Sequence, residues 1–313
     1  MRKGFRSRVA GATLLTLALI ATACGESGGD STTSTEAPPT TAADLPTITI
    51  GSTNFYEQLI LAEIYAQALE ADGYPVERKF NLGPREVVNP ALKSGEIDLI
   101  VEYTGTLLTF EGGTSSTDSM QTWEDLKEIL APSGLVALDY APAQDKNGIV
   151  VTAETAADLG ISKVSDLAGY NGQLIFGGPP ECPEREFCLI GLTEVYGLEF
   201  ADFKPLDAGG ALTVAALEGG DIDVALLFTS DGVIAAKGFV LLEDDLALQP
   251  SENLVPVIRE EILNAYGQDL ADLLNPITAA VSTAELTGLN KRYALDAEDA
   301  DALAAEWLAA HGF

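Results

Sequence analysis

Short apolar runs alternate with longer segments of helical period in the first third of the chain. The short runs are rich in β-branched residues, and they predict strands at 47–51, 76–81 and 97–103. The longer segments carry apolar residues at helical spacing, and they predict helices at 54–74 and 84–95. This order is typical of an α/β fold, in which helices cover both faces of a mostly parallel sheet.

The first predicted helix carries signals at both ends. Asn54 is the expected N-cap, with Glu57 as the N3 partner of a capping box. Gly73 is the expected C-terminal stop, because glycine readily adopts the left-handed conformation that ends helices.

The same alternation returns in the second half of the chain. Strands are expected at 148–152, 172–178 and 222–228. Helices are expected at 163–170, 191–198 and 211–220. We therefore expect two α/β lobes of similar design.

Two nine-residue stretches share one pattern at an offset of 125 positions. ALKSGEIDL (91–99) and ALEGGDIDV (216–224) each predict a helix end, a glycine and the start of a strand. Four residues further on lies an aromatic residue, Tyr103 in one copy and Phe228 in the other. Because ligands of open α/β sheets bind outside the carboxyl ends of strands, we expect these rings on opposite walls of one cleft that closes by hinge motion. Coincidence, with both rings packed in a core, is the alternative.

Acidic residues accompany both copies of the pattern. Asp98 and Asp223 open the strands and are expected to cap or orient the preceding helices. Glu102 and Asp231 lie near the far ends of the copies, within expected reach of the cleft. A carboxylate pair that hydrolyses a glycoside is the enzyme alternative. The chain has no P-loop or dinucleotide motif, so we expect no enzyme.

Composition narrows the classes of partner. The formal net charge of −31 disfavours nucleic acid and anionic membrane surfaces, and it suits a soluble protein outside the cell. The single histidine, His311, and only three cysteines argue against zinc sites and histidine-based catalysis. We expect neither a metal nor a cofactor.

The N-terminus has the features of an export signal. Residues 1–23 combine basic residues, an apolar run and small residues before Cys24, as in a signal peptide followed by a lipid-modified cysteine. Residues 24–45 are rich in Gly, Ser, Thr and Pro and are expected to form a flexible tether. We therefore expect anchoring through Cys24 at the outer face of the cytoplasmic membrane. Plain secretion with an incidental cysteine is the alternative.

The two remaining cysteines, Cys182 and Cys188, lie on either side of Arg185. In an exported protein such a close pair predicts a disulfide. We hypothesise that the bond stiffens the loop that carries Arg185. A redox or metal-binding role is the alternative.

Several stretches resemble the substrate-binding proteins of osmoprotectant ABC importers, which take up glycine betaine, choline, carnitine and related quaternary amines. The similar stretches run from about Thr47 to the C-terminus: IGSTNFYEQLILAEIYAQALEADGY, GPREVVNPALKSGEIDLIVEYTGT, EVYGLEF, GGDIDVALLFTSDG and LLEDD. The resemblance implies a type II periplasmic-binding-protein clamshell. Its lobe 1 would comprise 46–145 and 246–313 and its lobe 2 would comprise 146–245, with links near 143–148 and 243–248.

The resemblance also implies a ligand site. A cage of aromatic rings would surround a trimethylammonium head through cation–π attraction, and an arginine with hydroxyl or amide donors would hold a ligand carboxylate. Tyr103 and Thr106 match the binding residues of the EYTGT motif, and Phe228 matches an aromatic residue of the second lobe. Arg185 matches the arginine, assisted by backbone N–H groups of the helix after Tyr103. The alternative for Arg185 is a solvated surface charge.

Three positions depart from the family pattern. Thr53 stands where the family often has Lys, and Asn147 and Val214 stand where it often has Tyr. Aromatic residues near predicted loop ends are expected to complete the cage: Phe55, Tyr56 and Tyr140. The full candidate set for ligand binding is Phe55, Tyr56, Tyr103, Thr106, Asn147, Arg185, Phe228 and Asp231. A different polar, amino-acid-like metabolite is the alternative ligand.

The expected function is the capture of a small zwitterionic or cationic solute for an ABC permease subunit in the membrane. We expect a monomer that binds no nucleic acid. Two alternatives come from other classes. One is a sensor built on the same lobes, and the other is an adhesion or structural lipoprotein that binds no small ligand.

Overall fold

The computed structural model describes residues 45–313. The predicted signal peptide, the predicted lipidation of Cys24 and nearly all of the predicted tether lie outside the described residues. Within 45–313, no helix has the length and apolar character needed to cross a membrane.

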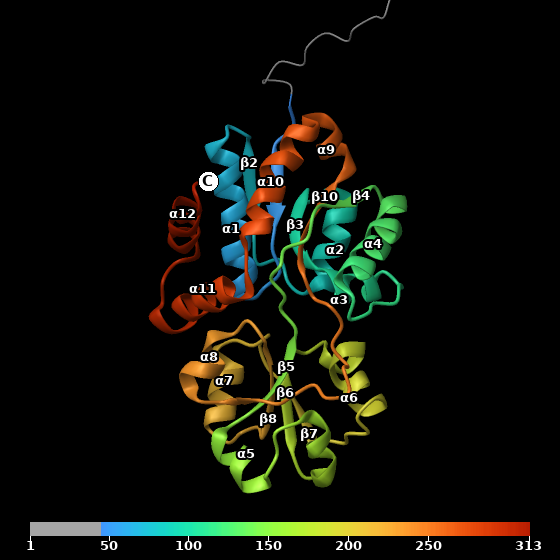
Figure 1. The fold of residues 1–313 in the computed structure, drawn as a ribbon, viewed down its shortest axis with the longest axis vertical. Coiled ribbons are helices and arrows are strands. Elements are labelled where there is room, and N and C mark those ends of the chain that lie inside the picture. Colours follow the sequence, from blue (N-terminus) through green and yellow to red (C-terminus); the bar gives the residue numbers. More distant parts are fainter. Residues whose placement is uncertain (1–44) are drawn as a thin grey trace, which may run out of the picture. The chain divides into compact units, whose positions relative to one another are not determined.

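The first sheet has five strands in the order β2-β1-β3-β10-β4. Its strands are β1 (Ile48–Gly51), β2 (Val76–Lys79), β3 (Leu99–Tyr103), β4 (Leu135–Ala137) and β10 (Leu254–Arg259). Its helices are α1 (Tyr56–Ala71), α2 (Arg85–Ser94), α3 (Thr104–Phe110), α4 (Ser119–Leu130), α9 (Glu260–Tyr266), α10 (Gln268–Ala280), α11 (Thr283–Asp296) and α12 (Ala300–His311). We call this sheet and these helices the first lobe (Figure 1).

The second sheet has five strands in the order β7-β6-β8-β5-β9. Its strands are β5 (Asn147–Val151), β6 (Ile175–Gly178), β7 (Asp202–Pro205), β8 (Val224–Phe228) and β9 (Val240–Leu241). Its helices are α5 (Ala153–Leu159), α6 (Gly191–Glu194), α7 (Ala211–Glu218) and α8 (Gly232–Lys237), with short helical turns at Val164–Tyr170, Cys182–Glu184 and Glu186–Ile190. We call these elements the second lobe.

In each five-stranded sheet, three adjacent strands are parallel and the fourth runs the other way, with an edge strand, β4 or β9, antiparallel to the fourth. The predicted parallel arrangement holds for β2-β1-β3 and for β7-β6-β8. The strands that follow the links between the sheets are antiparallel to their neighbours: β10 pairs with β3 and β5 pairs with β8. The two lobes therefore share one design, as the repeat predicts.

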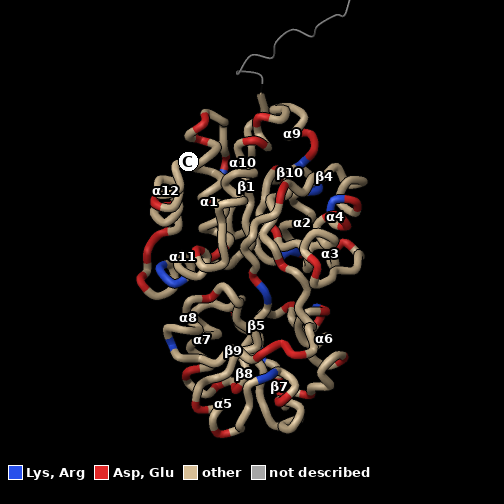
Figure 2. Tube along the Cα trace, viewed as in Figure 1, with Lys and Arg blue, Asp and Glu red and all other residues tan. Residues whose placement is uncertain are grey.

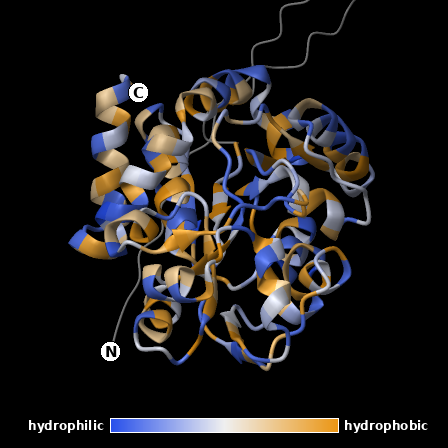
Figure 3. Cartoon of the chain, turned by 60° about the horizontal axis from the view of Figure 1, so that its bottom comes forward, coloured by the Kyte–Doolittle hydropathy of each residue, from blue (hydrophilic) through white to orange (hydrophobic). Residues whose placement is uncertain are grey.

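Both sheets are buried on both faces. Along β3, Leu99 and Val101 pack with α1, whereas Ile100 between them packs with α2 and α4 on the opposite face. This period of two is the one expected for a strand. Figure 3 shows the strands of both sheets coloured mainly as hydrophobic residues.

The aspartates of the repeat accept hydrogen bonds from neighbouring strands. Asp98 Oδ2 accepts a hydrogen bond from Thr49 N at 2.9 Å, and Asp223 Oδ2 accepts one from Ile175 N at 2.8 Å. Each aspartate thus holds the neighbouring parallel strand, and the predicted role as helix caps is wrong. The matching bonds make the two copies structurally equivalent.

The predicted capping box at the start of α1 is also wrong. The N-cap of α1 is Phe55, and it makes no side-chain cap hydrogen bond. The Glu57 side chain is only 1% exposed, because it turns inward to buried hydrogen-bond donors and away from Asn54. The prediction for the other end holds, since Gly73 follows the helix with φ of 90°.

Candidate functional site

A small cavity of about 80 Å³ lies between the carboxyl ends of β3 and β8. We call it the cleft, because residues of both lobes line it. Six of the predicted ligand-binding residues line the cleft: Phe55, Tyr103, Thr106, Asn147, Arg185 and Phe228. Tyr56 and Asp231 are not among the lining residues. A larger hollow of about 420 Å³ lies beside β5 and β9, but it shares only Asn147 with this set.

Three aromatic rings meet in the cleft. Phe55, in the loop between β1 and α1, lies 6.2 Å from Tyr103 and 5.0 Å from Phe228 between ring centroids. Its plane is within 27° of both neighbours, so the rings are stacked. Tyr103 ends β3 of the first lobe and Phe228 ends β8 of the second. The two rings of the repeat therefore lie in one cleft, with Phe55 between them.

The other aromatic candidates pack elsewhere. Tyr56 stacks on Tyr293 of α11 at 5.7 Å between centroids, and Tyr140 packs edge-on against Trp123 at 5.5 Å. Val214, at one of the divergent family positions, is nearly buried in α7. These residues therefore add no further ring to the three in the cleft.

Glu57 connects the two lobes directly behind Tyr103. The Tyr103 hydroxyl donates to Glu57 Oε1 at 2.6 Å, while Ser230 Oγ and Asn290 Nδ2 each donate to Glu57 Oε2 at 2.6 Å. Ser230 belongs to the second lobe and the other partners to the first. Burial raises the pKa of the Glu57 carboxyl, although the three donors act in the opposite direction. The Tyr103 hydroxyl is engaged here, so Tyr103 offers the cleft its ring.

Two further buried acids surround Glu57. Burial and the nearby Glu57 raise the pKa of Asp145 well above its usual range. Burial raises the pKa of Asp231 to about 6. Asp231 caps α8 by accepting a hydrogen bond from Val233 N at 3.0 Å, which explains its position outside the cleft lining.

Buried charged groups also line the cleft. Arg85, the first residue of α2, donates from Nε and Nη2 to both oxygens of Glu102 at 2.6–3.1 Å. Beside this pair, Glu252 Oε2 accepts hydrogen bonds from Gly105 N at 3.2 Å and Thr106 Oγ1 at 3.4 Å. Burial raises the pKa of Glu252 to about 7. Acidic residues also predominate along the rest of the described chain (Figure 2).

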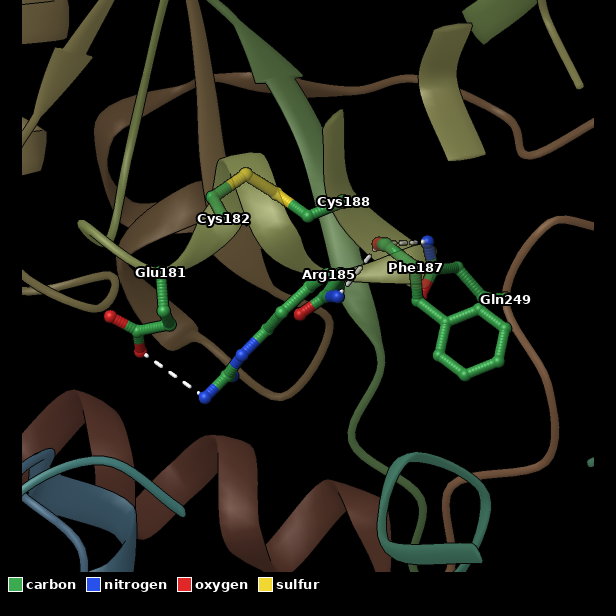
Figure 4. Close-up of a disulfide and its surroundings, with 7 residues drawn as sticks. Glu181, Cys182, Arg185, Phe187, Cys188 and Gln249 are labelled. Carbon is green, nitrogen blue, oxygen red and sulfur yellow. Dashed lines mark hydrogen bonds and ion pairs between the residues drawn. A yellow bond between two sulfur atoms is a disulfide. The ribbon is translucent and has the colours of Figure 1, made fainter. Parts of the chain in front are cut away.

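Arg185 lies in the loop closed by the disulfide between Cys182 and Cys188. Figure 4 shows its side chain extending from that loop toward Glu181. Arg185 Nη2 is 3.4 Å from Glu181 Oε1 and 2.9 Å from Oε2 of Glu86, which lies in α2 of the first lobe. The arginine therefore joins the two lobes at the edge of the cleft.

Sequence reasoning missed Arg85, Asp145 and Glu252 as cleft residues. Asp145 and Glu252 lie in or near the two links between the sheets, where Asp145 N donates to Glu252 O at 3.0 Å. The presence of acidic residues close to both predicted links could have identified Asp145 and Glu252 as cleft residues. Arg85 had no comparable signal, because its place depends on an ion pair with Glu102.

Removal of the disulfide should lower stability and loosen the Arg185 loop. A double Cys182→Ser, Cys188→Ser variant should lose about 2 kcal/mol of unfolding free energy, as expected for closure of so short a loop. Urea denaturation of both proteins measures the difference. Thiol titration of the unreduced protein in denaturant is the control, because both cysteines are buried in the native protein. Any reactive thiol beyond that of Cys24 would contradict the bond.

The chain is similar in sequence to known proteins. Residues 46–310 match a family model described as the substrate binding domain of ABC-type glycine betaine transport system. The chain is 31% identical over 278 residues to the glycine betaine-binding protein YehZ of Escherichia coli strain K12, covering 85% of this chain and 91% of that protein. It is 30% identical over 281 residues to a glycine-betaine-binding protein of Pseudomonas aeruginosa PAO1, covering 86% and 89%.

A solved structure supports the fold. The crystal structure of a glycine betaine/carnitine/choline ABC transporter matches with a TM-score of 0.68 at 25% identity, covering 85% of this chain and 98% of that one. The predicted two-lobed, type II clamshell is confirmed. Within 45–313, no group of His, Cys, Asp and Glu side chains is arranged to hold a metal ion.

Proposed function

Because the chain belongs to the family of substrate-binding domains of ABC-type glycine betaine transport systems, we propose that it captures a small quaternary ammonium solute and delivers it to an ABC permease. The observation that carries this proposal is the meeting of Phe55, Tyr103 and Phe228 in one cleft. Aromatic faces attract a quaternary ammonium head, at about 0.5–2 kcal/mol per ring.

The proposed roles follow from the positions of the side chains. The three rings receive the ammonium head, while Thr106 and Asn147 contribute polar groups of the cleft wall. Arg185 acts with Glu86 to hold the lobes together around the ligand. The lobes of this proposal are 46–145 with 246–313 and 146–245, and hinge motion at the links between them opens and closes the cleft.

The proposed place of action is the outer face of the cytoplasmic membrane. A signal peptide at 1–23 and lipid attachment at Cys24 would supply export and anchoring. There a monomer would release its ligand unchanged to the permease, with no catalytic turnover.

A ligand with a different polar group is the second candidate. The observation that favours it is the small number of rings, because Asn147 lies in the cleft where the family often has Tyr. Asn147 Nδ2 donates to Phe187 O at 2.9 Å, so it is also part of the wall around the disulfide loop.

Calorimetric titration of the purified protein separates these functions. We expect at least one of glycine betaine, choline, carnitine and proline betaine to bind, and glycine and proline to bind far more weakly. The amino acids are matched controls, because they lack the methylated ammonium head that the rings attract. Binding of an unmethylated amino acid with no binding of any quaternary amine would overturn the proposal.

A further inference from the structure

The groups expected to hold a ligand carboxylate already serve carboxylates of the protein. Gly105 N and Thr106 Oγ1, at the start of the helix after Tyr103, both contact Glu252 Oε2. Arg185 pairs with Glu86 and Glu181. An acidic group of a ligand therefore finds its expected donors occupied.

The remaining cation of the cleft is occupied as well. Arg85 makes a two-point ion pair with Glu102, a geometry that uses the guanidinium fork fully on one side. Among the described residues that line the cleft, the only cations are Arg85 and Arg185, against four carboxyl groups: Glu102, Asp145, Glu181 and Glu252. The lining thus favours a positive ligand and disfavours a negative group.

Glu252 also has an unused hydrogen-bond acceptor in this lining. Its side chain is only 1% exposed, and its Oε1 has no hydrogen-bond partner. Thr53 Oγ1, which belongs to the same lining, is buried without a partner too. A buried carboxylate oxygen without a donor is costly, so Glu252 Oε1 points to a ligand that carries a donor. The Thr53 hydroxyl can donate or accept, so it fits a ligand hydroxyl as well.

We propose that the cleft selects a quaternary ammonium alcohol, a singly charged cation with a hydroxyl donor, over a zwitterion with the same head. The three rings take the head, and Glu252 Oε1 accepts the hydrogen bond of the hydroxyl. This inference rests on the proposed function, because it concerns the ligand of the same cleft.

Proton release gives the proposal a second signature. Burial raises the pKa of Glu252 to about 7, and the groups that face it are the Arg85 cation and the Glu102 and Asp145 carboxyls. A bound cation stabilises the charged carboxylate, so binding expels a proton from Glu252. Affinity for the cation should therefore rise about tenfold between pH 6 and pH 8.

Choline and glycine betaine are matched probes, because they share the trimethylammonium head and differ in a hydroxyl against a carboxylate. Calorimetry with the full protein should give at least about tenfold tighter binding of choline. Glu252→Gln should weaken choline binding about tenfold and reduce the preference over glycine betaine. Glu194→Gln, which removes an exposed carboxylate outside the cleft, is the charge-matched control and should change neither affinity.

The outcomes separate the two proposals. Equal or tighter binding of glycine betaine would overturn the selectivity and leave the proposed function intact. An unchanged choline affinity in Glu252→Gln would overturn the role of Glu252. Binding of no quaternary amine by a cooperatively folded protein would overturn both. If Glu252→Gln fails to fold, choline titration of the unaltered protein in two buffers of different ionisation enthalpy measures the proton release instead. The absence of proton release would contradict the proposal.

Discussion

Acidification from about pH 8 to about pH 5.5 should stabilise the ligand-free protein. Burial raises the pKa of Glu252 to about 7 and of Asp231 to about 6, and it also raises the pKa values of Glu57 and Asp145. A carboxyl with a raised folded-state pKa binds its proton more tightly in the folded protein. Its contribution to stability is complete below the unfolded pKa and is lost as the pH rises through the folded pKa.

Glu252 and Asp231 alone should contribute about 2–3 kcal/mol over this interval. The unfolding midpoint should rise on the order of 5 °C, as measured by calorimetry in buffers of matched ionic strength. The gain should end near pH 4.5, because ion pairs and hydrogen bonds lower the pKa values of Glu70 and Glu285, whose contributions are lost at lower pH.

Variants locate the source of this effect. Glu252→Gln should remove much of the dependence on pH, because a glutamine has no proton to exchange in this range. Glu194→Gln, at an exposed position, should leave it unchanged. An unfolding midpoint that is constant or falls between pH 8 and pH 5.5 in the unaltered protein would contradict the raised pKa values.

The repeat explains why part of the site could be predicted from the sequence. In each lobe a helix, a glycine and a strand bring one aromatic residue to the carboxyl end of a central strand. These elements are local, so the positions of Tyr103 and Phe228 follow from patterns within about a dozen residues. The shared bonds of Asp98 and Asp223 show how closely the two copies correspond.

The buried acids could not be predicted in this way. Glu57 resembles a capping residue in sequence, but its donors Ser230 and Asn290 lie 173 and 233 positions away. Glu252 enters the cleft because β10 runs antiparallel to β3, with Leu254 opposite Tyr103. Such positions depend on the register of strands from distant parts of the chain, which local patterns do not determine.

Adjacent residues at the start of α1 also show what local sequence patterns cannot predict. Phe55 lies in the cleft, whereas Tyr56 stacks on Tyr293 of α11. Phe55 is the N-cap and has an extended backbone, with φ of -129° and ψ of 157°, whereas Tyr56 is the first residue of the helix. The change of backbone conformation between them sends the two rings into different surroundings. The sequence identified both rings as candidates, but the choice between them required the orientation of the helix.

Phe55→Ala should weaken binding of the preferred quaternary amine about 30-fold or more, which corresponds to about 2 kcal/mol. Phe55 stacks between Tyr103 and Phe228, so its removal takes one ring from the ligand and leaves the other two without their shared neighbour. Phe55→Tyr keeps the ring and should retain affinity within about threefold. Calorimetry or a fluorescence titration measures each affinity.

Two further variants make the test specific to the cleft. Tyr140→Ala removes an aromatic ring that packs on Trp123 outside the cleft, so it should leave ligand affinity unchanged. Tyr103→Ala should weaken binding as Phe55→Ala does, and it should also lower stability, because Glu57 loses the hydroxyl that donates to it. Tyr103→Phe separates these effects, since it retains the ring for the ligand and removes only the hydroxyl. If Phe55→Ala and Tyr103→Ala both bound the ligand as tightly as the unaltered protein, the ligand would bind elsewhere.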